Sequence, residues 1–304
     1  MGSKDTDMKP EDTKTEEVVE DAGIDYTELT DLKDIEPTDD NVAKIIERLS
    51  SEDWKENFYG FDDLRSLYKF HPGEFKQFLP KYKEYIKEGV ENLRSSICRN
   101  SLNLVVEVFS TDKNLAETDE NGEVTPYASF AVELLPIVCK KLADDKAFLS
   151  SRAKTATELI SAHCISKEIT EQLCELSRSK SLVISSEASH ALKANTALFS
   201  EERWKDPHNL DRLFKIISED LEGKRQPFTK NSKLIMKALK EKIGEEQLKI
   251  VAKESLGSDD EVNKIMQAFL IKKGKDSSKG FRDFLKKKKS VKQKKDQAAD
   301  QVFV

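Results

Sequence analysis

From about residue 40 to residue 273, apolar side chains recur every three or four positions, with charged side chains between them. This period gathers the apolar residues on one face of an α-helix, as Phe61, Leu64, Leu67 and Tyr68 illustrate. Short alternating runs of β-branched residues bounded by turns, which would predict strands, do not occur in the sequence. The pattern therefore predicts an all-α fold.

The predicted helices come in pairs. The second helices of these pairs begin near residues 54, 96, 148, 182, 228 and 260. The mean spacing of about 41 residues is typical of HEAT and armadillo repeats. The longest interval contains the polar insertion 117–127, which carries the turn residues Asn121-Gly122 and Pro126. We predict an α-solenoid of about six HEAT-like hairpins, each of which buries its apolar face on its neighbours. A four-helix bundle or an irregular helical domain is the alternative, but a bundle needs fewer and longer helices.

The charge is divided unevenly along the chain, although the formal net charge is only −6. Residues 1–40 hold 15 acidic residues against four lysines, and residues 272–295 hold 12 basic residues against two aspartates. Highly charged segments without helical periodicity do not bury enough apolar surface to fold. We therefore predict a disordered acidic tail over 1–38, a repeat domain over 39–273, and a basic, mostly disordered tail over 274–304.

Several classes of protein do not fit this sequence. The four cysteines fall inside apolar stretches without paired short spacing, which favours small apolar fillers over disulfides or zinc ligands. No apolar run approaches the roughly 20 residues that cross a bilayer, and the acidic start is unlike a signal peptide. We expect no membrane insertion and a location in the cytoplasm.

Catalytic motifs are also missing from the sequence. It contains no phosphate-binding glycine loop, no zinc-protease motif and no nucleophile elbow, and its four histidines are scattered. We expect no catalytic residues, no metal ligands and no cofactor. A binding protein is a better interpretation than an enzyme.

The turns inside the pairs carry the candidate binding residues, because in a HEAT array such turns align along one edge. Five of the six turns contain basic residues, and the first also contains a tryptophan. The residues are Trp54 and Lys55, Arg94 and Arg99, Lys146 and Arg152, Arg178 and Lys180, and Lys224, Arg225 and Lys230. A strip of cations beside one aromatic side chain would suit an acidic protein surface.

Three stretches resemble the TOG domain, a tubulin-binding HEAT array, and the resemblance covers about residues 40–272. The first is Asp53-Trp54-Lys55 followed by Gly60-Phe61-Asp62-Asp63. The second, NLRSSICRNSLNLVVEVF (92–109), is similar to the second repeat of the CLASP and crescerin branch. The third, DKAFLSSRAKTATELI, is similar to the third repeat of that branch, with Phe148 at an apolar position. The sequence departs from the family at Asn57 and Ser150, where the family often has basic residues.

The resemblance implies a function in binding αβ-tubulin or microtubules, and thereby in regulating or stabilising them. Trp54, Lys55, Ser96 and Arg99 would contact β-tubulin, Lys180, Lys224 and Arg225 would reach α-tubulin, and Lys146 would lie in the third turn. Self-association or other microtubule-associated proteins are further partners that it implies. The basic tail would add attraction to the acidic lattice, and its alternatives are a nuclear-localisation-like signal, a contact with RNA or an anionic membrane surface, or an inert solvated tail. The implied location is the cytoskeleton, including the cilium or axoneme.

Other interpretations of the same residues stay open. Trp54 could instead pack between the first two pairs, and Trp204, in the link between the fourth and fifth pairs, is expected to pack in the interior. The whole chain could be a general HEAT scaffold that binds other proteins and never tubulin. A nucleic-acid-binding solenoid is the third alternative, although we do not expect nucleic acid as the partner.

Overall fold

The computed structural model describes residues 26–111, 126–206, 210–223 and 227–270. Within these ranges the chain forms thirteen α-helices and one short 3-10 helix, η1, and no strand. The helices are α1 (Asp39–Leu49), α2 (Trp54–Phe70), α3 (Pro72–Glu91), α4 (Ser95–Thr111), α5 (Pro126–Lys140), η1 (Lys141–Ala143), α6 (Ala147–His163), α7 (Lys167–Leu176), α8 (Leu182–Ala197), α9 (Glu201–Lys205), α10 (Asp211–Gly223), α11 (Phe228–Ile243), α12 (Glu245–Leu256) and α13 (Asp259–Leu270).

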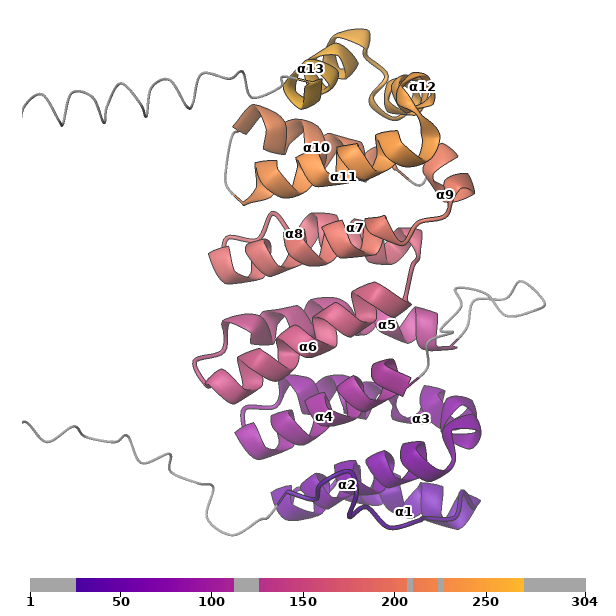
Figure 1. Ribbon diagram of the computed structural model, residues 1–304. Helices are drawn as coiled ribbons and strands as arrows, with labels where there is room; N and C mark the ends of the chain where they lie inside the picture. Colours follow the sequence, from indigo (N-terminus) through magenta and orange to yellow (C-terminus); the bar gives the residue numbers. More distant parts are fainter. Residues whose placement is uncertain (1–25, 112–125, 207–209, 224–226, 271–304) are drawn as a thin grey trace, which may run out of the picture.

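Twelve of these helices form six consecutive hairpins that stack into one elongated array (Figure 1). The second helices begin at residues 54, 95, 147, 182, 228 and 259, each within one residue of the position predicted from the sequence. The predicted all-α solenoid of about six HEAT-like hairpins is therefore confirmed. The short helix α9 is an addition, in the link between the fourth and fifth hairpins.

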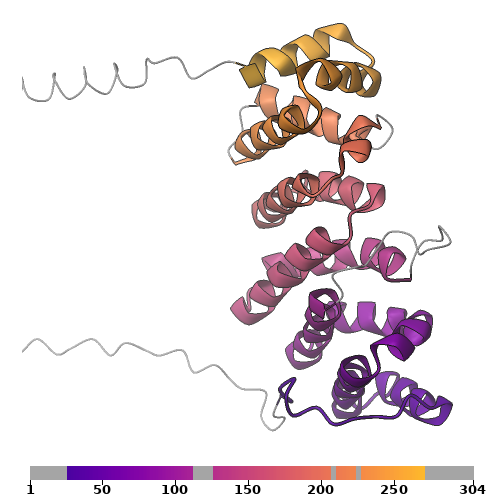
Figure 2. The same ribbon diagram turned by 45° about the vertical axis from the view of Figure 1, so that its right-hand side comes forward.

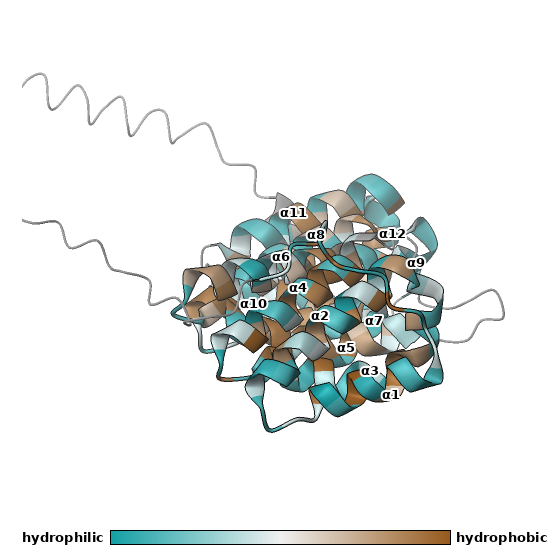
Figure 3. Ribbon diagram, turned by 90° about the horizontal axis from the view of Figure 1, so that it is seen from below, coloured by the Kyte–Doolittle hydropathy of each residue, from teal (hydrophilic) through white to brown (hydrophobic). Residues whose placement is uncertain are grey.

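The hairpins stack as two layers of helices. Helices α2, α4, α6, α8 and α11 contact one another in sequence and form one layer, while α3, α5, α7 and α10 form the other. The turned view in Figure 2 shows the two layers side by side along the stack. Figure 3, which looks along the stack, shows hydrophobic positions between the layers and hydrophilic positions on the outside. Burial of these apolar faces against neighbouring hairpins is the main stabilising term.

The sixth hairpin departs from this register. Helix α13 packs mainly on α10 and α12, whereas the regular arrangement would place it against α11. In Figure 1, α12 is seen nearly end-on, while the helices of the earlier hairpins lie across the view. The sixth turn therefore does not continue the row that the earlier turns form.

Local sequence signals set the helix ends. The Asp53 carboxylate caps α2 by accepting a hydrogen bond from the Lys55 amide at 2.9 Å, and Pro72 and Pro126 open α3 and α5. Gly257, at φ 70°, ends α12 in the left-handed conformation that favours glycine. These signals are local, which is why the helix boundaries follow from the sequence.

Trp204 lies in α9 and is fully buried. Its ring is 4.8 Å, centroid to centroid, from the ring of Phe199. The predicted packing role of Trp204 in the link between the fourth and fifth hairpins is confirmed.

Buried asparagines on three of the second helices, α4, α8 and α11, join the second, fourth and fifth hairpins to the hairpin before each of them. Asn100 Nδ2 donates to the Phe58 carbonyl at 3.1 Å, and Asn195 Nδ2 donates to the Ser161 carbonyl at 2.7 Å. Asn231 Nδ2 lies 2.9 Å from the hydroxyl oxygen of Ser189. Because a buried amide left unpaired is strongly destabilising, these bonds fix how α4, α8 and α11 pack on the second helix of the preceding hairpin.

The structure describes the chain ahead of α1 from Tyr26 onward, and we call residues 26–38 the N-terminal strap. Leu32 is buried, and the Asp34 carboxylate lies 2.7 Å from His71 Nε2 at the far end of α2. The prediction that disorder extends to residue 38 is therefore wrong for 26–38, because these residues pack on the first hairpin. Residues 1–25, the insertion as far as residue 125, and the basic tail lie outside the described residues.

Candidate functional site

The turns inside the first four hairpins lie along one edge of the stack, on the left in Figure 1. We use the name turn edge for residues 50–55, 91–99, 143–151 and 177–183, which are the first four turns with the first residues of the helices that follow. The described links between hairpins, residue 71, residues 164–166 and the segment with α9, lie along the opposite edge (Figure 1). The array therefore brings residues that are up to about 130 positions apart in sequence into one row, as a repeat stack does.

Trp54 is the first residue of α2 and is half-buried at the turn edge. One side of it packs against the core. The guanidinium carbon of Arg94, from the second turn, lies 4.1 Å from the centroid of the indole ring, and Lys55 Nζ lies 6.0 Å from it. A cation over an indole face is attracted by the ring quadrupole. Trp54 thus packs between the first two hairpins and is also accessible at the edge.

Arg99 makes a second cation–aromatic contact one turn of helix further into α4. Its guanidinium carbon is 4.0 Å from the ring centroid of Tyr26 and 5.6 Å from that of Phe148. Tyr26 belongs to the N-terminal strap, and Phe148 opens the third hairpin's second helix. Arg99 therefore links the strap, the second hairpin and the third hairpin at the turn edge.

Large apolar side chains are exposed in three successive turns of the turn edge. The exposed fractions are 99% for Leu93, 40% for Phe148, 67% for Leu182 and 50% for Val183. Phe148 was expected at an apolar position of the helix pattern, but in the structure 40% of it is exposed near the start of α6. Exposed apolar residues that align in this way favour a protein–protein contact.

A sequence signal for these residues exists, although the helical periodicity does not reveal it. An apolar residue, any residue and two serines open the second helix in three consecutive hairpins, as Leu93-Arg-Ser-Ser, Phe148-Leu-Ser-Ser and Val183-Ile-Ser-Ser. In each case the apolar residue is exposed. The repetition of this tetrapeptide at helix starts is what could have indicated the row.

The predicted binding residues divide into three groups in the structure. Lys55, Lys146 and Lys180 are exposed at the turn edge, Trp54 and Arg99 are half-buried there, and Ser96 is buried, with 3% exposed. The Ser96 hydroxyl has no hydrogen-bond partner and does not reach the surface, because α4 turns it inward. Lys224 and Arg225 lie outside the described residues, so their prediction stays untested.

Some basic residues of the turns act inside the array instead. Arg178 donates to Glu219 at 2.9 Å, to Asp220 at 2.8 Å and to the Ile216 carbonyl at 3.0 Å, and so fastens the fourth turn to α10. Arg152 is half-buried near Glu107. These arginines stabilise the stacking of hairpins and contribute little free positive charge.

Acidic residues also lie on the turn edge, so the edge is not uniformly basic. Glu91 pairs with Lys140 at 2.8 Å, and Asp144 and Asp145 lie beside them in the third turn. Glu52 and Asp53 precede Trp54 in the first turn. The second to fourth turns of the turn edge together hold five basic residues (Arg94, Arg99, Lys146, Arg178 and Lys180) and three acidic ones (Glu91, Asp144 and Asp145), while the first turn is acidic apart from Lys55.

A buried polar network lies beneath the edge and holds the N-terminal strap. Arg65, whose side chain is 3% exposed, donates to the Thr27 carbonyl at 2.9 Å and to Asp62 at 3.1 Å. It also pairs with Glu107 on α4 at 2.8 Å, and Asn100 donates to Asp62 at 3.0 Å. Burial raises the pKa of Glu107, and Arg65 partly offsets that rise. The charges of this network are paired in the interior, where an unpaired charge would be strongly destabilising.

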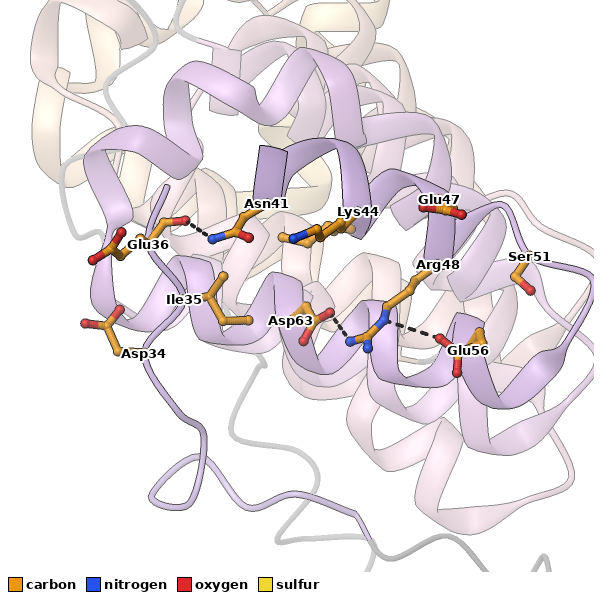
Figure 4. Close-up of a pocket in the computed structure, with 11 residues that line it drawn as sticks. Asp34, Ile35, Glu36, Asn41, Lys44, Glu47, Arg48, Ser51, Glu56 and Asp63 are labelled. Carbon is orange, nitrogen blue, oxygen red and sulfur yellow. Dashed lines mark hydrogen bonds and ion pairs between the residues drawn. The ribbon is translucent and has the colours of Figure 1, made fainter. Parts of the chain in front are cut away.

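A shallow groove lies at the N-terminal end of the stack, between residues 34–36, α1 and α2 (Figure 4). Arg48 crosses it to Asp63 at 2.6 Å and to Glu56 at 3.3 Å. Burial raises the pKa of Asp63, and the hydrogen bond from Arg48 opposes the rise. The arrangement ties α1 to α2.

The cysteines are buried and free. Burial raises the pKa of the Cys98 and Cys139 thiols to about 11 and that of Cys164 and Cys174 to about 12. The described ranges contain no cluster of His, Cys, Asp or Glu suited to a metal ion. No helix in them is both long and apolar enough to span a bilayer.

No protein-family model matches this chain, and no curated protein matches it in sequence. Among solved structures, the fold is similar to an engineered protein at 16% identity, with 77% of this chain and 96% of that chain covered and a TM-score of 0.40. It is also similar to a designed armadillo repeat protein in complex with the peptide (KR)4, at 15% identity, with 74% and 98% covered and a TM-score of 0.39. Neither likeness identifies a partner for this chain.

Proposed function

We propose that this chain is a non-enzymatic binding protein that holds αβ-tubulin, free or in microtubules, against its turn edge. The observation that carries the proposal is the row formed by the Trp54–Arg94 stack, the Arg99–Phe148 contact and the exposed Leu93, Leu182 and Val183. The residues of the first three turns also resemble those of TOG domains. A helical-repeat array is a common scaffold for protein recognition, and this row gives it a definite binding surface.

The chemistry of the row suits a large acidic protein surface. Binding hot spots concentrate in aromatic and arginine side chains that become desolvated at the centre of an interface. Trp54 would supply the aromatic anchor, and Arg94 would bring a cation against the same ring. Since neighbouring helices pack about 8–10 Å apart, the apolar residues of successive turns form contacts at regular intervals along the edge.

The individual roles follow the family resemblance where the side chains are accessible. Trp54, Lys55 and Arg99 would contact β-tubulin, while Lys146 and Lys180 would attract the acidic surface further along. Lys224 and Arg225 would extend that contact toward α-tubulin. Ser96 would act by packing beneath the edge instead of by touching the partner. The matching location is the cytoplasmic cytoskeleton, with ciliary microtubules as a specific case.

Co-sedimentation with microtubules and gel filtration with free tubulin test the proposal. We expect Trp54→Ala and Arg94→Glu each to weaken binding at least about tenfold, which is the size of effect seen for a hot-spot residue. Phe70→Ala is the matched control. Phe70 lies at the opposite end of α2, is 39% exposed and has Lys69 Nζ 4.6 Å from its ring centroid.

The outcomes test the identity of the partner and the position of the binding surface separately. Equal losses in Trp54→Ala and Phe70→Ala would show that the turn edge is not the binding surface. Failure of the wild-type chain to bind tubulin in either form would reject tubulin and leave the general HEAT scaffold. Binding of RNA that Arg94→Glu abolishes would favour the nucleic-acid alternative.

A further inference from the structure

The described chain begins at the turn edge. Tyr26 packs edge-to-face on Phe58, at 5.4 Å between ring centroids, and carries the Arg99 guanidinium on its face at 4.0 Å. Arg99 in turn faces Phe148, the exposed aromatic residue of the third turn. Residues 1–25 therefore enter the structure within the row of residues that we assign to partner binding.

The position of that entry is fixed. Thr27 donates its hydroxyl to Asp62 at 2.8 Å, and its carbonyl accepts from the buried Arg65 at 2.9 Å. Further along the strap, Lys69 Nζ donates to the carbonyls of Thr30 and Leu32 at 3.4 Å. Because several buried or half-buried bonds hold the strap, the preceding residues are tethered beside Arg99.

The tethered segment complements the exposed lysines and apolar side chains of the second to fourth turns. Residues 1–25 contain nine acidic residues against three lysines, and Val18, Val19 and Ile24 are interspersed near their end. Acidic side chains suit the exposed Lys146 and Lys180, and small aliphatic side chains suit Leu93, Phe148 and Leu182. The match includes both charge and apolar surface.

We propose that residues 1–25 bind in cis along the second to fourth turns of the turn edge and compete there with an external acidic partner. The competition rests on the proposed function, whereas the docking of the segment does not. Displacement of this segment would then be the step at which partner binding is regulated.

Residues 1–25 are long enough to extend from the second turn to the fourth. A flexible chain of 25 residues has a root-mean-square span of roughly 25–30 Å. Two hairpin steps along the stack amount to roughly 20 Å, from the second turn to the fourth. A short tether gives an effective concentration in roughly the millimolar range, so even weak contacts suffice for docking.

Paramagnetic broadening in nuclear magnetic resonance spectra of the full chain tests the docking without any partner. A nitroxide on Thr15→Cys reports where the segment lies, since the four native cysteines are buried and would not take the label. We expect broadening of the amides of Leu93, Phe148 and Leu182 on the turn edge. The amides of Phe70, His163 and Leu198, which lie on the opposite edge, serve as controls.

Neutralising the segment provides the matched variant. With Glu16→Gln, Glu17→Gln, Glu20→Gln and Asp21→Asn in the full chain, we expect the broadening at Leu182 to fall to the level of the control edge. The same loss should follow when salt rises to about 0.5 M, because screening weakens exposed ion pairs. The neutralised chain should bind tubulin about three- to tenfold more tightly than the wild-type chain.

Several results would overturn the proposal. Broadening that is equal on both edges, or unchanged by neutralisation, would show that the segment does not dock on the turn edge. Broadening confined to residues 271–304 would show that the basic tail captures it. Broadening of an isotope-labelled chain by a separate nitroxide-labelled copy would show exchange between copies instead of docking in cis. If the expected broadening is seen but the chain does not bind tubulin, docking of residues 1–25 is supported. Tubulin as the partner, and competition with it, are then rejected.

Discussion

The guanidinium carbon of Arg94 lies 4.1 Å from the centroid of the Trp54 ring, and this contact joins the turn of the first hairpin to the turn of the second. The Arg99–Phe148 contact joins the second hairpin to the third in a similar way. Residues of the proposed binding surface therefore also bridge neighbouring hairpins. A partner that engages them would act on the relative tilt of the hairpins, because each contact spans a hairpin boundary.

Leu93→Ser is predicted to leave stability nearly unchanged. Leu93 is 99% exposed, so its loss should alter the free energy of unfolding by less than about 0.5 kcal/mol. The control is Leu102→Ala in α4, where full burial predicts a loss of about 2–5 kcal/mol. Urea unfolding measures both. A large destabilisation by Leu93→Ser would show that this residue packs within the fold, contrary to its assignment to the binding surface.

Gly89→Ala is predicted to destabilise the first and second hairpins. A Cβ atom at Gly89 would lie 2.2 Å from Cζ of Phe61, so the ring or the α2–α3 packing must shift, at about 1–3 kcal/mol. Gly73→Ala is the matched control, because nothing lies within 4 Å of its Cβ and alanine favours the helix by up to about 1 kcal/mol. Thermal unfolding should give a lower Tm for Gly89→Ala than for the wild type, and an equal or higher Tm for Gly73→Ala. Similar Tm values for Gly89→Ala and the wild type would contradict the close contact with Phe61.

Arg65→Ala is predicted to be strongly destabilising at neutral pH, by about 3–5 kcal/mol, since it leaves Asp62 and Glu107 without their buried partner. Arg48→Ala is the control. Its ion pairs with Asp63 and Glu56 are partly exposed, so it should cost about 1 kcal/mol or less.

The loss of unfolding free energy caused by Arg65→Ala should become smaller as the pH falls. Burial raises the pKa of Glu107, and Arg65 opposes that rise, so removing Arg65 should raise the folded-state pKa further above its unfolded value. A carboxyl group with a raised folded-state pKa stabilises the fold as it takes up a proton. The deficit relative to the wild type should therefore shrink between about pH 7 and about pH 5, as measured by urea unfolding at each pH. A deficit that is constant or grows over this range would show that Glu107 is not the group left unpaired.

The four cysteines are predicted to be unreactive in the folded protein. Their thiol pKa values of about 11 and about 12 leave almost no thiolate at neutral or mildly alkaline pH. Ellman's reagent should detect no fast-reacting thiol in the native chain and four in urea, and Thr15→Cys should add one fast-reacting thiol as a control. A native cysteine that reacts as fast as this added thiol would show that part of the solenoid opens readily.

The order and position of the helices were determined by the sequence alone. Apolar periodicity, caps such as Asp53 and breaks such as Pro72 and Pro126 act within a few residues, so the starts of the second helices could be predicted to within one residue. The burial of Trp204 could also be predicted from the sequence, because a large apolar ring in the link between two hairpins can pack against the apolar residues of both.

Only the tertiary structure decided which residues of the turns are available to a partner. Ser96 and Phe148 both lie near the start of a second helix, yet Ser96 is buried whereas Phe148 is partly exposed beside Arg99. The order of the N-terminal strap depends on Arg65 and Lys69, which lie some 35 to 40 residues away in sequence. These outcomes depend on how one hairpin sits on the next, and that geometry arises from contacts between distant segments that local periodicity does not encode.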